Sequence, residues 1–156
     1  LNHIHTPMET PLNETTGTPE SDKNIPKVTG IGGIFFYTDN PAGTKDWYVK
    51  NLGLDINAWG ASSFDSRDLH NPDEINTLQW CPFKKDSAHF APSQKEFMIN
   101  YRVQHIEALV EKLKANGVTV VDAIETFDFG KFVHIMDNEG NKIELWEPME
   151  NTQEKK

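Results

Sequence analysis

The stretch Phe132-Val-His-Ile-Met-Asp-Asn-Glu-Gly-Asn-Lys-Ile-Glu-Leu-Trp-Glu-Pro148 decides how the rest of the chain is interpreted. It predicts two strands, residues 132–136 and 142–146, joined by Asp, Asn and Gly residues that adopt turn conformations readily. If the strands pair across a five-residue loop, His134 lies opposite Glu144 on one face, with Cβ atoms roughly 5 Å apart. The sequence therefore predicts a titratable pair within otherwise apolar strands.

Composition limits the classes of partner. The chain has 156 residues, enough for one domain or for two small halves that share a core. A net charge of −9 without any run of basic residues argues against a nucleic-acid partner. No apolar run approaches the roughly 20 residues that cross a bilayer, so we expect no membrane partner. We expect a cytoplasmic protein, an expectation that a signal removed before Leu1 would change.

The ends of the chain differ from its middle. Residues 1–27 contain four prolines and many polar residues, so they cannot bury enough apolar area to offset the entropy of ordering. We predict a disordered polar tail there and a charged C-terminal tail over residues 149–156. The domain then spans residues 28–148, with modules at about 28–83 and 96–148 and a polar connector between them.

In the first module, the sequence predicts a strand over residues 30–38, followed by a helix. Asn40 is a suitable N-cap, Pro41 suits the first helical position, and Gly53 suits the C-terminal end. Short strand-like pieces follow around Ile56, Phe64 and Leu78.

The second module repeats this order. A strand over residues 97–103 is followed by a helix with apolar residues at helical spacing, namely Ile106, Leu109, Val110 and Leu113, and Gly117 ends it. Strands are predicted over residues 118–121, 127–136 and 142–146.

The two halves align with each other at a spacing of about 65 positions. Gly33-Ile-Phe-Phe-Tyr37 matches Met98-Ile-Asn-Tyr-Arg102, and Trp80-Cys-Pro82 matches Trp146-Glu-Pro148. The predicted fold is α+β: two tandem βαβββ modules that form curved mixed sheets around a cleft, with the helices on the outer faces.

A duplicated unit that ends in Asp137-x-x-Gly-Asn-x-Ile-Glu-Leu-Trp146 resembles the vicinal oxygen chelate superfamily, which holds glyoxalase I, bleomycin-resistance and extradiol-dioxygenase-like proteins. The resemblance covers about residues 28–148 and implies a homodimer. The superfamily includes lyases, isomerases, dioxygenases, thiol transferases and drug-sequestering binders, so it implies the fold more narrowly than the function.

In metal-dependent members, four strand positions hold a divalent ion. The resemblance carries these positions onto Gly33, Leu78, Met98 and Glu144. Only Glu144 is a suitable ligand, because Gly33 and Leu78 offer no donor atom and the Met98 thioether is too soft for hard divalent ions. We expect no resident metal and no other cofactor, with a divalent metal at Glu144 as the alternative.

His134 and Glu144 are the catalytic candidates. A histidine beside a carboxylate can perform acid–base chemistry near neutral pH, and the same pair can also be purely structural. Residues that share the alternation of the metal positions are ligand-binding candidates, because they would line a wide, mostly apolar cleft suited to an organic molecule. They are Phe35, Tyr37, Trp80, Met98 and Trp146. Asn100 and Arg102 are further candidates, which could orient polar groups or an anion, or could simply be solvated at the surface.

Three functions are compatible with these residues. The first is a metal-free protein that binds a small organic molecule. The second is a glyoxalase-like lyase or isomerase that acts on a small carbonyl compound, with His134 as acid or base and Glu144 as its partner. The third is a structural or partner-binding domain. The sequence does not identify the ligand.

Overall fold

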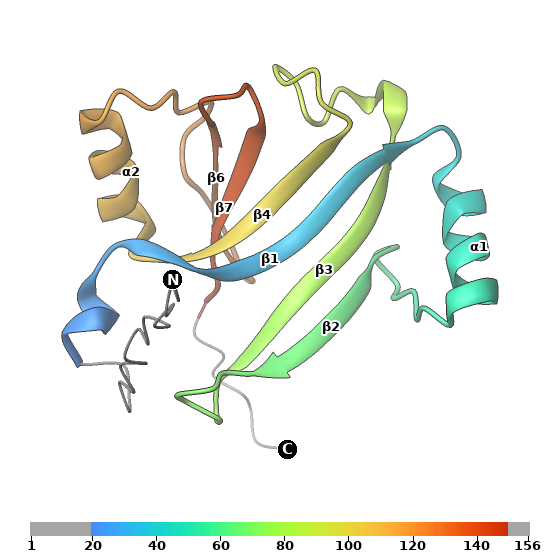
Figure 1. The fold of residues 1–156 in the computed structure, drawn as a ribbon, viewed down its shortest axis with the longest axis horizontal. Helices are drawn as coiled ribbons and strands as arrows, with labels where there is room; N and C mark the ends of the chain where they lie inside the picture. The colour runs from blue at the N-terminus through green and yellow to red at the C-terminus, as the bar shows by residue number, and fades with distance from the viewer. Residues whose placement is uncertain (1–19, 150–156) are drawn as a thin grey trace, which may run out of the picture.

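The computed structural model describes residues 20–149, which form two α-helices and a seven-stranded mixed sheet (Figure 1). In chain order the elements are η1 (Glu20–Asn24), β1 (Lys27–Thr38), α1 (Pro41–Leu52), β2 (Ser62–Arg67), β3 (Ile75–Lys84), η2 (Lys85–Ser87), β4 (Phe97–Gln104), α2 (Ile106–Ala115), β5 (Glu125–Phe127), β6 (Gly130–Met136) and β7 (Lys142–Glu147). The strand order is β2-β3-β1-β4-β7-β6-β5. The predicted α+β class is confirmed.

The two helices begin and end largely as the sequence predicts. The Asn40 side chain accepts a hydrogen bond from the Gly43 amide at 3.0 Å, and Gly53 adopts a left-handed conformation with φ 67° at the end of α1. The start of α2 uses a partner that is distant in sequence, because the Glu147 carboxylate of β7 accepts from the Ile106 amide at 2.5 Å. This bond ties the last strand to the helix above it.

Cross-strand register divides the sheet into two faces, since directly opposed residues point to the same side. One face, here called the helix face, carries Ile34, Ile99 and Ile143, which are aligned across β1, β4 and β7. The opposite face, here called the site face, carries Glu144 and His134, which are opposed across β7 and β6.

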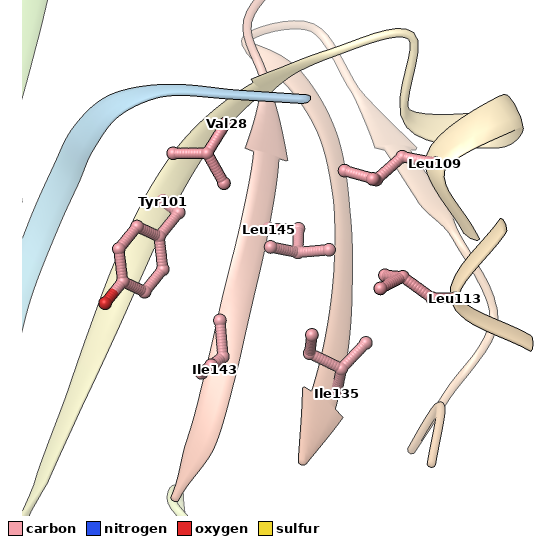
Figure 2. Close-up of a pocket in the computed structure, with 7 residues that line it drawn as sticks. All are labelled: Val28, Tyr101, Leu109, Leu113, Ile135, Ile143 and Leu145. Carbon is pink, nitrogen blue, oxygen red and sulfur yellow. The ribbon is translucent and has the colours of Figure 1, made fainter. Parts of the chain in front are cut away.

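The main core lies on the helix face beneath α2. Its buried members are Val103, Ile106, Leu109, Val110, Val133, Ile135 and Leu145. Figure 2 shows seven side chains from β1, β4, β6, β7 and α2 that point toward one another around an apolar hollow of about 230 Å³. By contrast, α1 buries none of its residues and lies at the other end of the sheet (Figure 1). Packing therefore anchors the second half of the chain more firmly than the first.

Several predicted boundaries need correction. Residues 20–27 belong to the fold rather than to a tail, because the Gln104 side chain donates to the carbonyls of Asp22 and Ile25 in this segment. Residues 118–121 form only an isolated bridge, Val120 to Ile135, and the predicted strand 127–136 is divided into β5 and β6 by a turn. No strand forms around Ile56. The predictions for residues 1–19 and 150–156 lie outside the described residues.

The polar connector between the halves packs against the site face. The Phe90 ring is fully buried and stacks on Tyr37, with ring centroids 4.1 Å apart. The Phe90 amide donates to the Tyr37 hydroxyl at 2.7 Å, and Lys142 of β7 donates to the carbonyl of His89. The connector therefore covers one end of the site face.

Within the part of the chain that is described, no helix is long and apolar enough to cross a membrane.

Candidate functional site

The predicted hairpin forms in the predicted register. Met136 pairs with Lys142, which places His134 directly opposite Glu144. The turn is held by the Asp137 carboxylate, which accepts from the amides of Glu139 and Asn141 at 2.8 and 2.9 Å. Turn length therefore sets the pairing on which the site depends.

A continuous chain of hydrogen bonds crosses the site face, and we call its members Asn100, Glu144, His134 and Asp122 the polar chain. The Asn100 amide donates to Glu144 Oε1 at 2.7 Å, and His134 Nε2 lies 2.7 Å from Glu144 Oε2. His134 Nδ1 lies 2.6 Å from Asp122 Oδ2. Both carboxylate oxygens of Glu144 and both ring nitrogens of His134 are therefore occupied.

The two carboxylates change the acidity of the imidazole. Burial of the ring acts to lower the pKa of His134, but the hydrogen bonds to Glu144 and Asp122, and then the charges of these groups, outweigh it and raise the pKa. A raised pKa favours the imidazolium ion, in which both ring nitrogens donate. The polar chain therefore suits a cation held between two anions.

Asp122 is the functional candidate that the sequence analysis missed. The segment before it runs along β6, where the Val121 amide donates to the His134 carbonyl at 2.8 Å. The Asp122 carboxylate accepts in return from the His134 backbone amide at 2.7 Å. A strand was predicted over residues 118–121, but an aspartate just beyond a strand carries no signal for a histidine partner twelve residues away.

The predicted metal positions do not form a metal site. A Cβ atom at Gly33 would lie 2.7 Å from Cζ of Phe35, so the Phe35 ring lies over the glycine. In register, Phe35 is flanked by Met98 on one side and Cys81 on the other. An aromatic ring therefore occupies the space beside the first predicted position.

The fourth predicted metal position needs correction from Leu78 to Cys81. In the second half, Glu144 pairs with Asn100. Phe35 aligns with Asn100 in the sequence repeat and pairs with Cys81, so Cys81 is the first-half equivalent of Glu144. Burial raises the pKa of the Cys81 thiol, which disfavours the thiolate that binds metals.

The donor set does not fit a divalent ion. It consists of a protonated thiol, a buried thioether and a carboxylate whose two oxygens already accept hydrogen bonds. No group of three or more His, Cys, Asp or Glu side chains among residues 20–149 is arranged to hold a metal ion.

Five of the seven predicted ligand-binding residues lie on the site face near the polar chain. Arg102 and Trp146 are adjacent on the site face, and both are partly exposed. Met98 and Asn100 are buried there, and Asn100 Oδ1 has no hydrogen-bond partner within residues 20–149. Phe35 leans over Gly33, as described above.

The remaining two candidates lie apart from the polar chain. Tyr37 is covered by the connector through Phe90. Trp80 is a correction: it pairs with Ile34 on the helix face, and its ring lies 4.7 Å from Tyr48 of α1. Trp80 therefore packs beneath a helix and does not share a face with Trp146.

An aromatic cluster that the sequence analysis did not single out extends from Trp146 through Phe132 to Phe127 and Phe129. The rings of Phe132 and Trp146 are nearly parallel, with centroids 6.0 Å apart. Phe127 and Phe129 stack on each other at 5.4 Å, and their exposed fractions are 45% and 64%. The spacing F-x-F in the β5–β6 turn was a signal for this cluster, since both rings lie beside a strand of the site.

A protein-family model matches residues 30–145, and its description is Glyoxalase/Bleomycin resistance protein/Dioxygenase superfamily. The chain belongs to this superfamily. The predicted resemblance is therefore confirmed over most of the described residues. No curated protein gives a significant match to the chain.

Similar solved structures support the same fold. Methylmalonyl-CoA epimerase from Mycobacterium tuberculosis is 21% identical, with a TM-score of 0.51, and the match covers 81% of this chain and 95% of that one. A variant of the Streptomyces coelicolor epimerase in complex with 2-nitronate-propionyl-CoA is 18% identical, with a TM-score of 0.56 and coverage of 78% and 99%. A methylmalonyl-CoA epimerase bound to methylmalonyl-CoA and NH4+ is 17% identical, with a TM-score of 0.57 and coverage of 80% and 97%. At these identities the likeness establishes the fold of this superfamily member and not its ligand.

Replacing Gly33 by Ala should lower the free energy of unfolding by about 1–3 kcal/mol, the usual cost of overfilling a packed site. The new Cβ would lie 2.7 Å from the Phe35 ring, so Phe35→Leu should relieve part of that cost. Urea denaturation of the two single variants and the double variant should then give a coupling energy of at least about 0.5 kcal/mol.

The matched control is Phe36→Leu, the next residue along β1, whose ring lies on the helix face against Trp80. It should show no coupling to Gly33→Ala. An equal cost of Gly33→Ala in the wild-type and Phe35→Leu backgrounds would contradict the packing of Phe35 over Gly33.

The raised pKa of His134 predicts a pH-dependent contribution to stability. The contribution is fully present below the unfolded-state pKa of about 6.5 and is lost as pH rises through the higher folded-state pKa. The stability difference between wild type and His134→Gln should therefore be largest at mildly acidic pH and shrink as pH increases.

Urea denaturation across the range from mildly acidic to mildly alkaline pH measures this difference. His70→Gln is the matched control, because His70 lies in an exposed turn. A stability difference for His134→Gln that does not change with pH would show that the carboxylates do not hold His134 as a cation.

Proposed function

We propose that this superfamily member binds a small organic molecule on its site face and does so without a bound metal ion. The polar chain is the observation that carries this proposal. It commits both oxygens of Glu144 and both ring nitrogens of His134 to partners within the protein. His134 has no free ring nitrogen, and Glu144 would have to share its oxygens with these hydrogen-bond partners in order to ligate a divalent ion.

The surroundings of the polar chain support an organic ligand. The aromatic cluster presents the exposed rings of Phe127 and Phe129 beside Phe132, and such rings bind planar or apolar groups. Arg102 adds a cationic group on the same face. Apolar surface with a few polar groups is the usual composition of a small-molecule site.

The register also supports an origin of the fold from two copies of one module. Ile34 pairs with Ile99, the residue aligned with it in the other half, as expected where a two-fold axis passes between β1 and β4. The second half follows the order βαβββ, whereas the first half has two strands after its helix. The curved arrangement around a cleft, the cytoplasmic location and the homodimer stay predictions.

Elemental analysis and ligand screening test the proposed function. Protein purified without chelator and then dialysed against a weak chelator should retain far less than one divalent ion per chain. Fragments found by saturation-transfer NMR should bind with the same dissociation constant before and after EDTA treatment. A stoichiometric divalent ion, or an affinity that EDTA abolishes, would contradict metal-free binding.

A lyase or isomerase that acts on a small carbonyl compound is the second candidate, and the contact between Asp122 and His134 favours it. A carboxylate that fixes one nitrogen of an imidazole orients the other nitrogen for proton transfer. Here Nε2 points to Glu144, so a proton could pass between the imidazole and that carboxylate. Epimerase is the activity named for the similar structures, and it is a property of those proteins.

If this second candidate is correct, His134→Gln should lower the turnover of an identified substrate by about 10²–10⁴-fold, the usual contribution of a positioned acid or base. Asp122→Asn should lower turnover as well, because the imidazole loses its orienting carboxylate. His70→Gln is the control. Unchanged turnover in His134→Gln would reject proton transfer through this histidine.

A further inference from the structure

The Arg102 side chain crosses the site face in a space that a glycine leaves open. Arg102 of β4 is aligned with Gly30 of β1 on one side and with Trp146 of β7 on the other. A Cβ atom at residue 30 would lie 2.5 Å from Arg102 Nη2, so the guanidinium lies over Gly30. Arg102 Nη1 reaches the carbonyl of Thr77 on β3 at 3.4 Å.

The guanidinium has unused hydrogen-bonding capacity. It carries five N–H donors, and the contact with Thr77 is its one side-chain hydrogen bond within residues 20–149. No carboxylate in the same part of the chain lies within salt-bridge distance of it. Burial lowers the pKa of Arg102, while the charges of Glu74 and Asp68 act through space to raise it. A partly buried cation without a paired anion is unusual, because desolvation of a charge is normally offset by a partner.

Next to Arg102, the Trp146 indole lies flat across the sheet between two glycines. A Cβ atom at Gly32 would lie 2.9 Å from Cε3 of the indole, and one at Gly130 would lie 2.4 Å from Nε1. The indole N–H donates to the Phe129 carbonyl at 3.1 Å. These contacts fix the ring, and Phe132 extends the aromatic surface in a nearly parallel plane.

We propose that Arg102 and the aromatic cluster together bind a planar aromatic or conjugated carboxylate. This inference rests on the proposed function and names its ligand class. A guanidinium binds a carboxylate through two parallel hydrogen bonds, and the rings of Trp146 and Phe132 stack on a planar group. A monoanion fits better than a phosphate dianion, since the site has one guanidinium while the chain carries a net charge of −9.

Cinnamate and its neutral isostere cinnamamide test this inference with the full chain. Binding is followed in ¹H–¹⁵N spectra through the indole N–H of Trp146 and the Nε–H of Arg102. Cinnamate should shift both signals, and cinnamamide should bind at least about tenfold more weakly, as expected from loss of a charge-assisted hydrogen bond.

Arg102→Gln should weaken cinnamate binding by at least about tenfold and leave cinnamamide unaffected. Arg102→Lys keeps the charge without the bidentate geometry and should be intermediate. Arg67→Gln is the matched control, because Arg67 lies on the edge strand β2 and donates to the Pro72 carbonyl. Spectral dispersion like that of the wild type establishes that each variant is folded.

The outcomes separate this inference from the proposed function. Equal binding of cinnamate and cinnamamide, or cinnamate binding that Arg102→Gln leaves unchanged, overturns the carboxylate assignment but leaves metal-free small-molecule binding in place. Failure of both probes to shift Trp146 overturns the inference as well. The proposed function itself falls if elemental analysis finds a stoichiometric divalent ion, or if the fragment screen finds no ligand for the site face or finds binding that requires a metal.

Discussion

The imidazole of His134, held between the carboxylates of Asp122 and Glu144, is the interaction on which the site face depends. It joins β6 to β7 and to the segment before β5, while Asn100 extends the chain of hydrogen bonds to β4. A carboxylate as buried as Glu144 is costly unless a cation or hydrogen-bond donors compensate it. The raised pKa of His134 is the reciprocal consequence, because the two anions favour the charged imidazole.

This arrangement also supports the proposed binding of an organic molecule without a metal ion. In the first half, Phe35 fills the space beside Gly33, and a half-buried thiol, Cys81, is its neighbour on β3. In the second half, His134 Nε2 lies 2.7 Å from a Glu144 oxygen, and the raised pKa of His134 favours the charged imidazole beside that carboxylate. One half of the site face is therefore mostly apolar, and the other holds the hydrogen-bonded polar chain. The exposed aromatic cluster and Arg102 lie next to the polar half, where a ligand could contact them.

The sequence predicted features that depend on local rules. The length of the turn from Asp137 to Asn141 was enough to place His134 opposite Glu144, because turn geometry fixes register in a hairpin. The capping residues Asn40 and Gly53 bounded α1 for similar reasons. These predictions needed no knowledge of the tertiary structure.

Features that depend on long-range pairing were not predictable in the same way. Trp80 and Trp146 align in the sequence repeat, but they are not equivalent in the sheet. Trp146 pairs with Arg102, and Tyr37, which aligns with Arg102 in the first half, pairs with Phe83. Phe83 is therefore the structural equivalent of Trp146. Trp80 lies three residues before Phe83, and residues an odd number of positions apart on a strand point to opposite faces of the sheet. Asp122 was missed because its contact depends on how a loop runs along β6.

The protonation state of the His134 ring tests most directly whether the two carboxylates favour the charged imidazole. Long-range ¹H–¹⁵N NMR correlation at a pH of about 7 distinguishes a ring with two protonated nitrogens from a neutral ring with one. Because the pKa of His134 is raised, we predict that Nδ1 and Nε2 both carry protons in a larger fraction of molecules than they would in an ordinary imidazole at the same pH. A neutral ring with an unprotonated Nε2 at that pH would contradict it, because that nitrogen would be free to ligate a metal ion.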